Sequence, residues 1–290
     1  MIISFSSLAL PAVALGFTTV TYNNFASTAG LTLNGDAHSV ANNGFGDTDA
    51  LQLDPTGEIF QYGTAFSTTP LQAASGFSTV FQWRMTDPGG VTDPSGQTGA
   101  DGLTFTVQTE SSGAGNAGGG IGYGGITPSV AVKFDTFQNT EFNDPSSNYI
   151  GVATDGNLNN ADYPGGQTNV ATQFDNGTVW TSWIDYNGTT LNIYAVDANT
   201  DVKPSTPLLT YNVNIPSILG QSTAFVGFTS AGGDAYENTY IRNWTYYDHY
   251  NPTGGGSPST VPLPTAGASG LFLLCCLGAI KKIHSHVTSA

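Results

Sequence analysis

Three features of the sequence predict an all-β protein built as a two-sheet sandwich. The chain of 290 residues has 37 glycines and only 9% charged residues, whereas the surface of a helical protein carries many Glu, Lys and Arg residues. No segment between Phe17 and Tyr250 shows a sustained apolar repeat with the period of an α-helix. Short strand-like runs recur at close spacing through the same region, which is typical of sandwiches.

Alternation along the chain indicates the individual strands. In residues 77–85, Phe, Thr, Phe, Trp and Met alternate with Ser, Val, Gln and Arg, which is the period of a strand. Further strands are expected at residues 103–107, 130–134, 179–186, 191–196, 208–215 and 225–228. Asn187 and Gly188 lie between two of these runs and predict a tight hairpin, because both residue types tolerate positive φ angles.

We expect one domain over residues 17–250, because no linker-like stretch interrupts the chain before Asn251. Residues 1–14 are apolar and end in an Ala-x-Ala pattern, so we expect a signal peptide there. Both cysteines, Cys275 and Cys276, lie in the C-terminal tail, so the domain is expected to fold without a disulfide bond.

The C-terminal tail indicates how the protein is sorted in the cell. A Gly/Ser/Pro linker at residues 251–260 precedes residues 261–290, which contain Val-Pro-Leu-Pro, an apolar stretch from Ala266 to Ile280, and two lysines. The apolar stretch is shorter than the roughly 20 residues of a membrane span. This tail resembles the PEP-CTERM sorting signal of exopolysaccharide-producing Gram-negative bacteria, in which the tail enters the membrane transiently before processing. A plain C-terminal membrane anchor is the alternative.

The charge distribution argues against one class of partner. All 21 acidic residues but only four of the six basic ones lie at or before Asp248, a net charge of −17 for that region. A field of this sign repels phosphate backbones, so we expect no nucleic-acid binding.

A strand followed by a loop, residues 131–152, carries oxygen ligands at the spacing that a hard cation needs. Asp135, the carbonyl of Phe137, the amide oxygen of Asn139, and Asp144 are the candidate ligands. Calcium takes six to eight oxygen ligands, whereas zinc and copper prefer the imidazole or thiolate groups that this segment lacks. The sequence therefore predicts one calcium site.

The same segment resembles the metal-binding motif of the legume-type (L-type) lectins, in which Asp-Thr-aromatic-x-Asn precedes Asp-Pro and a short strand. Further family motifs recur in family order at residues 22–25, 33–37, 51–53, 100–105, 118–125 and 226–232. The resemblance covers about residues 17 to 248. It implies a concanavalin-like jelly-roll sandwich with a curved front sheet, and carbohydrate binding.

The resemblance also implies the sugar-binding residues. Asp101 would accept hydrogen bonds from two sugar hydroxyls, after a cis Ala100–Asp101 peptide bond. Gly119 would offer its backbone N–H, and Asn139 would bind calcium through its oxygen and sugar through its nitrogen. The remaining implied contacts are the ring of Phe137 and the loop that contains Gly233 and Asp234.

Each of these residues has a plainer alternative. Asp101-Gly102 suits a hairpin turn, Phe137 suits a core position on a strand, and Gly119 suits a flexible surface loop.

Two departures from the family bear on the metal. Plant members bind a transition metal through a Glu and a His at the positions that hold Lys133 and Tyr149 here. An ammonium and a phenol should not support manganese, so we expect no transition-metal site. Lys133 is instead expected to pair with Asp135 or Asp144.

Two other functional classes remain alternatives. A glycoside hydrolase of this fold needs two carboxylates across a groove, and none of the four Glu residues lies in an alternating acidic strand motif. A structural protein of the envelope or extracellular matrix, with a decayed sugar site, is the second alternative. We expect a lectin rather than an enzyme, exported to the envelope or the exterior of a Gram-negative-type bacterium. Its expected partners are glycans or exopolysaccharide, and a homo-oligomer would strengthen weak single-site binding.

Overall fold

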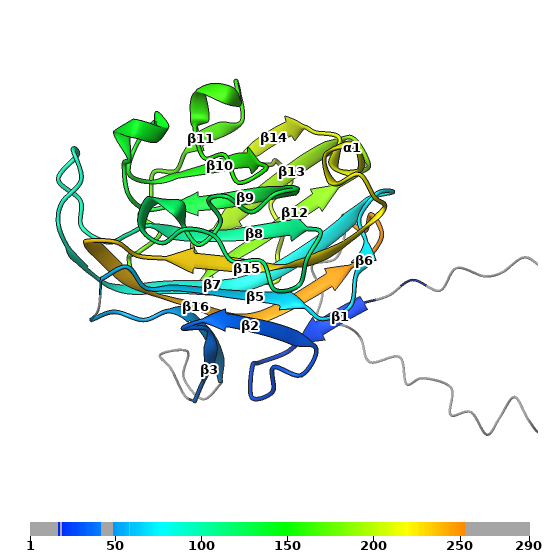
Figure 1. The fold of residues 1–290 in the computed structure, drawn as a ribbon, viewed down its shortest axis with the longest axis horizontal. Helices are drawn as coiled ribbons and strands as arrows, with labels where there is room; N and C mark the ends of the chain where they lie inside the picture. Colours follow the sequence, from blue (N-terminus) through cyan, green and yellow to red (C-terminus); the bar gives the residue numbers. More distant parts are fainter. Residues whose placement is uncertain (1–16, 18, 42–48, 58, 253–290) are drawn as a thin grey trace, which may run out of the picture. The chain divides into compact units, whose positions relative to one another are not determined.

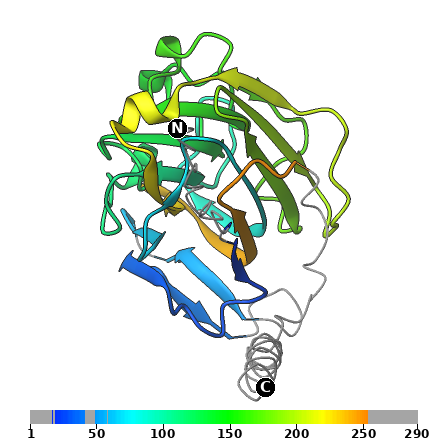
Figure 2. The same ribbon diagram turned by 90° about the vertical axis from the view of Figure 1, so that its right-hand side faces the viewer.

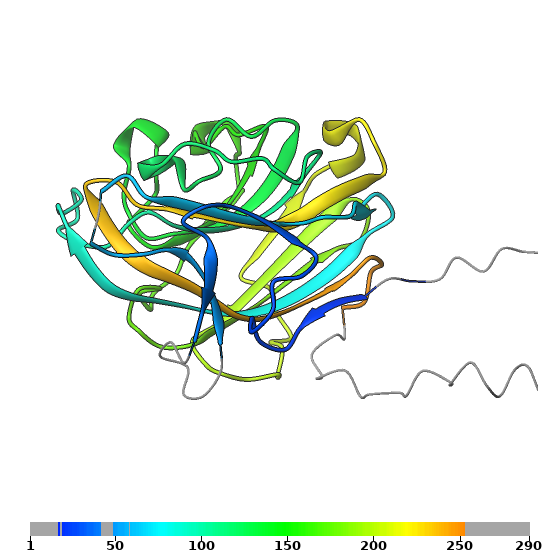
Figure 3. The same cartoon turned by 60° about the horizontal axis from the view of Figure 1, so that its bottom comes forward.

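The computed structural model describes residues 17, 19–41, 49–57 and 59–252. They form two antiparallel sheets of eight strands each, which confirms the expected all-β sandwich (Figures 1 and 3). The expected signal peptide, nearly all of the linker and the C-terminal sorting signal lie outside these residues. Within them, no helix has both the length and the apolar character that a membrane crossing requires.

The first sheet contains β1 (Thr19–Tyr22), β3 (His38–Val40), β4 (Ala50–Asp54), β7 (Phe77–Gly90), β12 (Trp180–Tyr186), β13 (Thr190–Val196), β14 (Leu209–Asn212) and β16 (Ala235–Tyr247). Their order is β14-β13-β12-β7-β16-β4-β3, and β1 pairs with β16.

The second sheet contains β2 (Leu31–Gly35), β5 (Tyr62–Ser67), β6 (Leu71–Gln72), β8 (Gly102–Gln108), β9 (Ser129–Asp135), β10 (Tyr149–Thr154), β11 (Gln167–Asn169) and β15 (Thr223–Ala231). Their order is β11-β10-β9-β8-β15-β5-β2, and β6 pairs with β15. Non-consecutive neighbours in both sheets show the crossovers of a jelly roll.

One expected strand is too long. The run at residues 208–215 ends as a strand at Asn212, and Ile215 begins the short helix α1 (Ile215–Leu219), which is yellow in Figure 2. The reason is local: the side chain of Asn214 accepts a hydrogen bond from the Ser217 N–H at 3.0 Å and so caps the helix.

The hairpin predicted at Asn187 is present but has a three-residue loop, because β12 ends at Tyr186 and β13 begins at Thr190. Only Gly188 has a positive φ angle. Asn187 contributes differently, since its side-chain oxygen accepts hydrogen bonds from the N–H groups of Thr189 and Thr190.

Aromatic side chains from both sheets fill the space between them. Phe81 of β7 meets Phe228 of β15 edge to face, with ring centroids 5.0 Å apart, and Trp83 lies 5.3 Å from Phe134 of β9. The large residues of the alternating run at residues 77–85 therefore face the core, as the sequence predicts.

A second, smaller apolar cluster lies on the other face of β9 and β10. It contains Tyr123, Ile126, Ala131, Ala153, Leu158 and Tyr163, with Phe142 packed against it. Because strand neighbours point to opposite faces, Val132 joins the main core while Ala131 joins this cluster. The cluster anchors three loops on the second sheet, which include the 3₁₀ helices η1 (Gly118–Gly120), η2 (Thr140–Phe142) and η3 (Asn160–Asp162). In Figure 1 these loops, in green, lie beside β8, β9 and β10.

Candidate functional site

Asp101 lies directly before β8, in a buried position with an accessible fraction of 3%. The peptide bond between Ala100 and Asp101 is cis, as the resemblance implies. Gly102 already pairs with Asp135 in the sheet, so Asp101-Gly102 is not a hairpin turn. The Asp101 N–H donates to the carbonyl of Ala231 at 2.8 Å, which ties Asp101 to the end of β15.

In the described part of the chain no hydrogen bond to the Asp101 carboxylate is found, and only burial and neighbouring charges act on it. Burial raises its pKa well above the usual range, and the negative charges of Asp135 and Asp54 add to this effect. Asp101 is therefore a buried acceptor whose partner is to be supplied by a ligand or a proton.

Two glycine loops flank this carboxylate. A Cβ atom built on Gly118 would lie 4.0 Å from Asp101 Oδ2, and one built on Gly233 would lie 3.7 Å from the same atom. The Gly118 N–H donates to the carbonyl of Gly232 at 2.9 Å, so the two loops are joined by their backbones. Asp234 is exposed at the tip between β15 and β16, and no recorded contact joins its side chain to Asp101.

Gly119 lies beside Asn139. A Cβ atom on Gly119 would come within 2.8 Å of Asn139 Nδ2, so any larger residue would displace the amide. The N–H groups of Gly118 and Gly120 donate to backbone carbonyls, whereas no acceptor for the Gly119 N–H is found in the described part of the chain. The structure thus brings Asp101, Gly119, Asn139 and Gly233 into one neighbourhood from four loops.

The candidate cation ligands lie together at the end of β9. The Phe137 N–H donates to Asp135 Oδ1 at 3.2 Å, and the Asn139 N–H donates to Asp144 Oδ2 at 2.7 Å and to the Phe137 carbonyl at 3.1 Å. These bonds fold the loop tightly and keep Asp135, Phe137, Asn139 and Asp144 close together along it.

Behind these ligands lies a network of three donors. Lys133 Nζ is 3.6 Å from Asp135 and 3.7 Å from Asp144, so it pairs with both aspartates. The Tyr149 hydroxyl contacts both carboxylates, and Asn160 Nδ2 donates to Asp144 Oδ1 at 2.6 Å. The two ion pairs confirm the pairing expected for Lys133. Because Lys133 is only 1% exposed, a single ammonium faces two buried carboxylates.

The donor set fits calcium. Burial, together with the charge of Asp144, raises the pKa of Asp135 to about 8, even though Lys133 lowers it. Oxygen-only ligands are those that calcium prefers. In the described part of the chain no three His, Cys, Asp or Glu side chains gather closely enough to hold a metal ion by themselves. The candidate set instead combines two carboxylates with the Phe137 carbonyl and the Asn139 amide.

Sequence reasoning missed two residues of this site. Asn160 lies on η3, 16 residues after Asp144, and only the tertiary fold returns it to the ligands. Phe60 is 57% exposed, and its ring lies within 4 Å of Cβ positions on Gly118 and Gly233. Its N–H donates to the Gly233 carbonyl at 3.3 Å. The sequence signal that could have indicated Phe60 is an aromatic residue in the polar loop before β5.

A second group of buried carboxylates lies near Asp101 but outside the cation ligands. Asp54 of β4 is 1% exposed and neither of its carboxylate oxygens has a partner among the described residues. Glu237 of β16 is fully buried and accepts one hydrogen bond, from Thr136 Oγ1 at 3.0 Å. Burial raises the pKa of Asp54 to about 8 and that of Glu237 well above its usual range.

Comparison with known families decides the identity of the domain. The model of the legume lectin domain matches residues 18–260 of this chain. The chain belongs to the legume lectin family. This lectin domain therefore belongs to a family of carbohydrate-binding proteins, and its two-sheet jelly roll is the fold of that family.

Two plant receptor kinases show how far this lectin resembles known sequences. The L-type lectin-domain containing receptor kinase SIT2 of rice is 36% identical over 123 residues, 40% of this chain and 18% of the kinase. The receptor kinase VIII.1 of Arabidopsis thaliana is 29% identical over 229 residues, 77% of this chain and 29% of the kinase. The chain thus spans less than a third of the length of either relative.

Among solved structures, the lectin from Bauhinia forficata in complex with GalNAc has a TM-score of 0.63 at 23% identity. The alignment covers 80% of this chain and 98% of that one. At this identity the likeness establishes the fold alone.

Proposed function

We propose that this legume lectin domain binds glycans in a calcium-dependent manner. The observation that carries the proposal is the approach of Gly119 to Asn139, beside the unpartnered carboxylate of Asp101. Asn139 also lies within the oxygen ligands that fit a cation. One residue therefore belongs to both the cation ligands and the sugar contacts, which links the two binding events.

Each residue has a distinct task in this proposal. Asp101 accepts hydrogen bonds from two sugar hydroxyls, and Gly119 and Asn139 donate to the sugar from the opposite side. Calcium, when bound to Asp135, Phe137, Asn139 and Asp144, supplies charge neutralisation and orients the Asn139 amide. Lys133, Tyr149 and Asn160 hold the two carboxylates in place, as residues around a metal site commonly do.

Aromatic contact with the apolar face of the sugar has two candidates. Phe137 is partly exposed and lies two residues after Asp135 in the loop, as the resemblance requires. Phe60 stands over Gly118 and Gly233, and it is the more exposed ring. We assign both to the sugar site, with Phe60 on the Asp101 side and Gly233 and Asp234 closing the last loop.

The hydrolase alternative has little support. Glu237 has a strongly raised pKa, as a catalytic acid would, but it is fully buried and cannot contact a polysaccharide. A binding role without catalysis agrees better with this arrangement. The export signal, the C-terminal sorting signal, the bacterial envelope location and homo-oligomerisation are part of the proposal and rest on the sequence alone.

Calorimetric titration of the purified protein with a glycan panel, in calcium and in chelator, tests the function. We expect binding in calcium, loss of binding in chelator, and at least a 100-fold weakening in Asp101→Asn. The exposed Asp201→Asn is the matched control and should bind normally. Absence of binding in both conditions would identify a scaffold with a decayed site, and release of reducing sugar would identify a hydrolase.

A further inference from the structure

The loop of residues 135–144, which we call the cation loop, carries the candidate cation ligands, and one of its contacts leads to a different loop. The N–H groups of Phe137 and Asn139 bond to other groups of the cation loop itself. The N–H of Gln138, which lies between them, donates instead to Oδ2 of Asp93 at 3.1 Å, 45 residues earlier in the chain. This bond holds the backbone from which both Phe137 and Asn139 project.

The Asp93 carboxylate is well placed to accept this bond. It is 5% exposed, and its other oxygen, Oδ1, accepts from the Ser95 N–H at 2.8 Å, the Ser95 hydroxyl at 2.7 Å and the Gln97 N–H at 3.0 Å. Burial alone would raise the pKa of Asp93, but the hydrogen bonds from Ser95, Gln138 and Gln97 hold it below its usual range. Asp93 is therefore ionised at neutral pH, and the donors to Oδ1 fix the carboxylate so that Oδ2 faces Gln138.

The loop that carries Asp93, residues 91–99, also reaches the rest of the proposed sugar site. At its start the Val91 N–H donates to the Asp234 carbonyl at 3.1 Å. At its end the loop lies two residues before Asp101 in the chain. One short loop thus connects three parts of the proposed sugar site.

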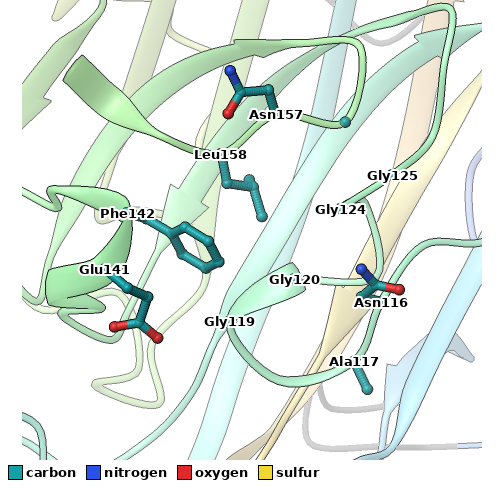
Figure 4. Close-up of a pocket in the computed structure, with 11 residues that line it drawn as sticks. Asn116, Ala117, Gly119, Gly120, Gly124, Gly125, Glu141, Phe142, Asn157 and Leu158 are labelled. Carbon is teal, nitrogen blue, oxygen red and sulfur yellow. The ribbon is translucent and has the colours of Figure 1, made fainter. Parts of the chain in front are cut away.

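The two ends of the cation loop are held by other contacts. Strand β9 ends at Asp135 and fixes the near end. At the far end, Phe142 of η2 packs against the small apolar cluster and lies beside Leu158 (Figure 4). The middle of the cation loop, at Gln138, is held by Asp93. The bond to Asp93 therefore supports the part of the loop that β9 and the apolar cluster leave to it.

We propose that Asp93 is a positioning residue of the sugar site, which holds Phe137 and Asn139 in the conformation that binds the cation and the sugar. Because its loop leads into Asp101, the same carboxylate keeps the acceptor Asp101 and the donor Asn139 at a fixed separation. The inference rests on the proposed calcium-dependent lectin function and adds a residue that contacts neither ligand. The alternative is a carboxylate that only folds its own loop.

The substitution Asp93→Asn separates these two roles. The amide oxygen can still accept the bonds from Ser95 and Gln97, whereas the NH₂ group turns a donor toward the Gln138 N–H. The loop of Asp93 is thereby kept, and only the bond to the cation loop is lost. Ser95→Ala is the matched control, because it removes a donor to Oδ1 and leaves the bond from Gln138 in place.

Residue-resolved hydrogen exchange in chelator reports on this bond without any ligand. Exchange of the Gln138 N–H should be about tenfold faster or more in Asp93→Asn, because a hydrogen bond to a charged group is lost. It should be unchanged in Ser95→Ala. The N–H groups of Ser95 and Gln97 should stay protected in Asp93→Asn.

Calorimetric titration measures the consequences for binding. The probes are calcium chloride and, in saturating calcium, the methyl glycosides of galactose, mannose and N-acetylglucosamine. Asp93→Asn should weaken the binding of calcium and of sugar about tenfold each, the lower end of the range for residues that support a metal ligand. Ser95→Ala and the exposed Asp201→Asn, which removes one negative charge elsewhere, should keep the wild-type affinities.

The outcomes separate this inference from the lectin function. Wild-type exchange and affinities in Asp93→Asn, or equal losses in Ser95→Ala, overturn the positioning role. Loss of protection at Ser95 and Gln97 together with Gln138 assigns Asp93 to its own loop and overturns it as well. If the wild type binds calcium but none of the sugars, the lectin function fails. Faster exchange at Gln138 and weaker calcium binding in Asp93→Asn then still support Asp93 as the residue that positions the cation loop.

Discussion

Two groups of buried carboxylates lie close to the proposed sugar site, and they differ in the donors and counter-charges around them. Asp135 and Asp144 receive hydrogen bonds from Tyr149 and Asn160 and face the ammonium of Lys133. Asp54 and Glu237 lack such a counter-charge, and three of their four oxygens have no partner among the described residues.

The difference lies in the donors that act against burial. Lys133, Tyr149 and Asn160 act against burial at Asp135 and Asp144 and fix the geometry of the two carboxylates, although burial still leaves the pKa of each raised. At Asp54 only burial and the charge of Asp36 act, and both raise the pKa, while Glu237 has the single donor Thr136 against burial. The two groups thus differ in the donors around them, and we expect a cation only at the group that has them.

The largest effect is expected when the ammonium of Lys133, which faces Asp135 and Asp144, is removed. Lys133→Met should lower the free energy of unfolding in chelator by about 3 to 5 kcal/mol, because two buried carboxylates lose their counter-ion. Calcium should restore much of this loss. Urea unfolding in chelator and in calcium measures both values.

Lys203→Met is the matched control for Lys133→Met. Lys203 pairs with Asp185 on the first sheet, away from the cation ligands, so its removal should cost the same with and without calcium. An equal cost for both lysine variants in both conditions would contradict a cation site at Asp135 and Asp144.

A pH series tests the second group of carboxylates, through Asp54. The pKa of Asp54 is raised to about 8 in the folded protein from a usual value of 3.8, so the folded state binds its proton more tightly than the unfolded state does. Stability should therefore fall as pH rises from about 4 to 8. Asp54→Asn removes this slope and should gain about 1 to 3 kcal/mol over the wild type between pH 5 and pH 8.

Chemical unfolding of wild type and Asp54→Asn at pH 5, 6, 7 and 8, in saturating calcium, measures this slope. Calcium keeps the charge on the cation ligands constant, so the slope reports on the other group. Parallel curves for the two proteins would show that Asp54 titrates normally.

Removal of one supporting donor should weaken calcium binding while sparing the fold. Asn160→Ala deletes the bond to Asp144 Oδ1 and should lower calcium affinity by about 10 to 100-fold, the range for residues that support a metal ligand. Calorimetric titration with calcium measures it. Asn159→Ala is the neighbouring control, because Asn159 bonds only within its own turn and to exposed Asn143.

The smallest effect is expected at the rim of the site. Phe60→Ala should weaken sugar binding by about 1 kcal/mol, roughly fivefold in Kd, because it removes an exposed ring that makes no charged contact. Its calcium affinity should stay at the wild-type value. A parallel loss of calcium affinity would place Phe60 in the fold rather than in the sugar site.

Much of the fold could be predicted because its signals are local. The alternation in residues 77–85 and the hairpin at Asn187 each involve neighbours along the chain, and both are present. The run at residues 208–215 misled because its apolar content cannot distinguish a strand from a short buried helix, and the Asn214 cap decided between them.

What the sequence by itself determined is the all-β architecture, the legume lectin family and the ten-residue span from Asp135 to Asp144 with oxygen ligands at cation spacing. Only the tertiary structure decided that Lys133 serves both aspartates, that Asn160 returns to Asp144, and that Phe60 stands by Asp101. The physical reason is that periodicity and ligand spacing act over a few residues. Contacts between loops depend on how two packed sheets and one small apolar cluster bring distant segments together.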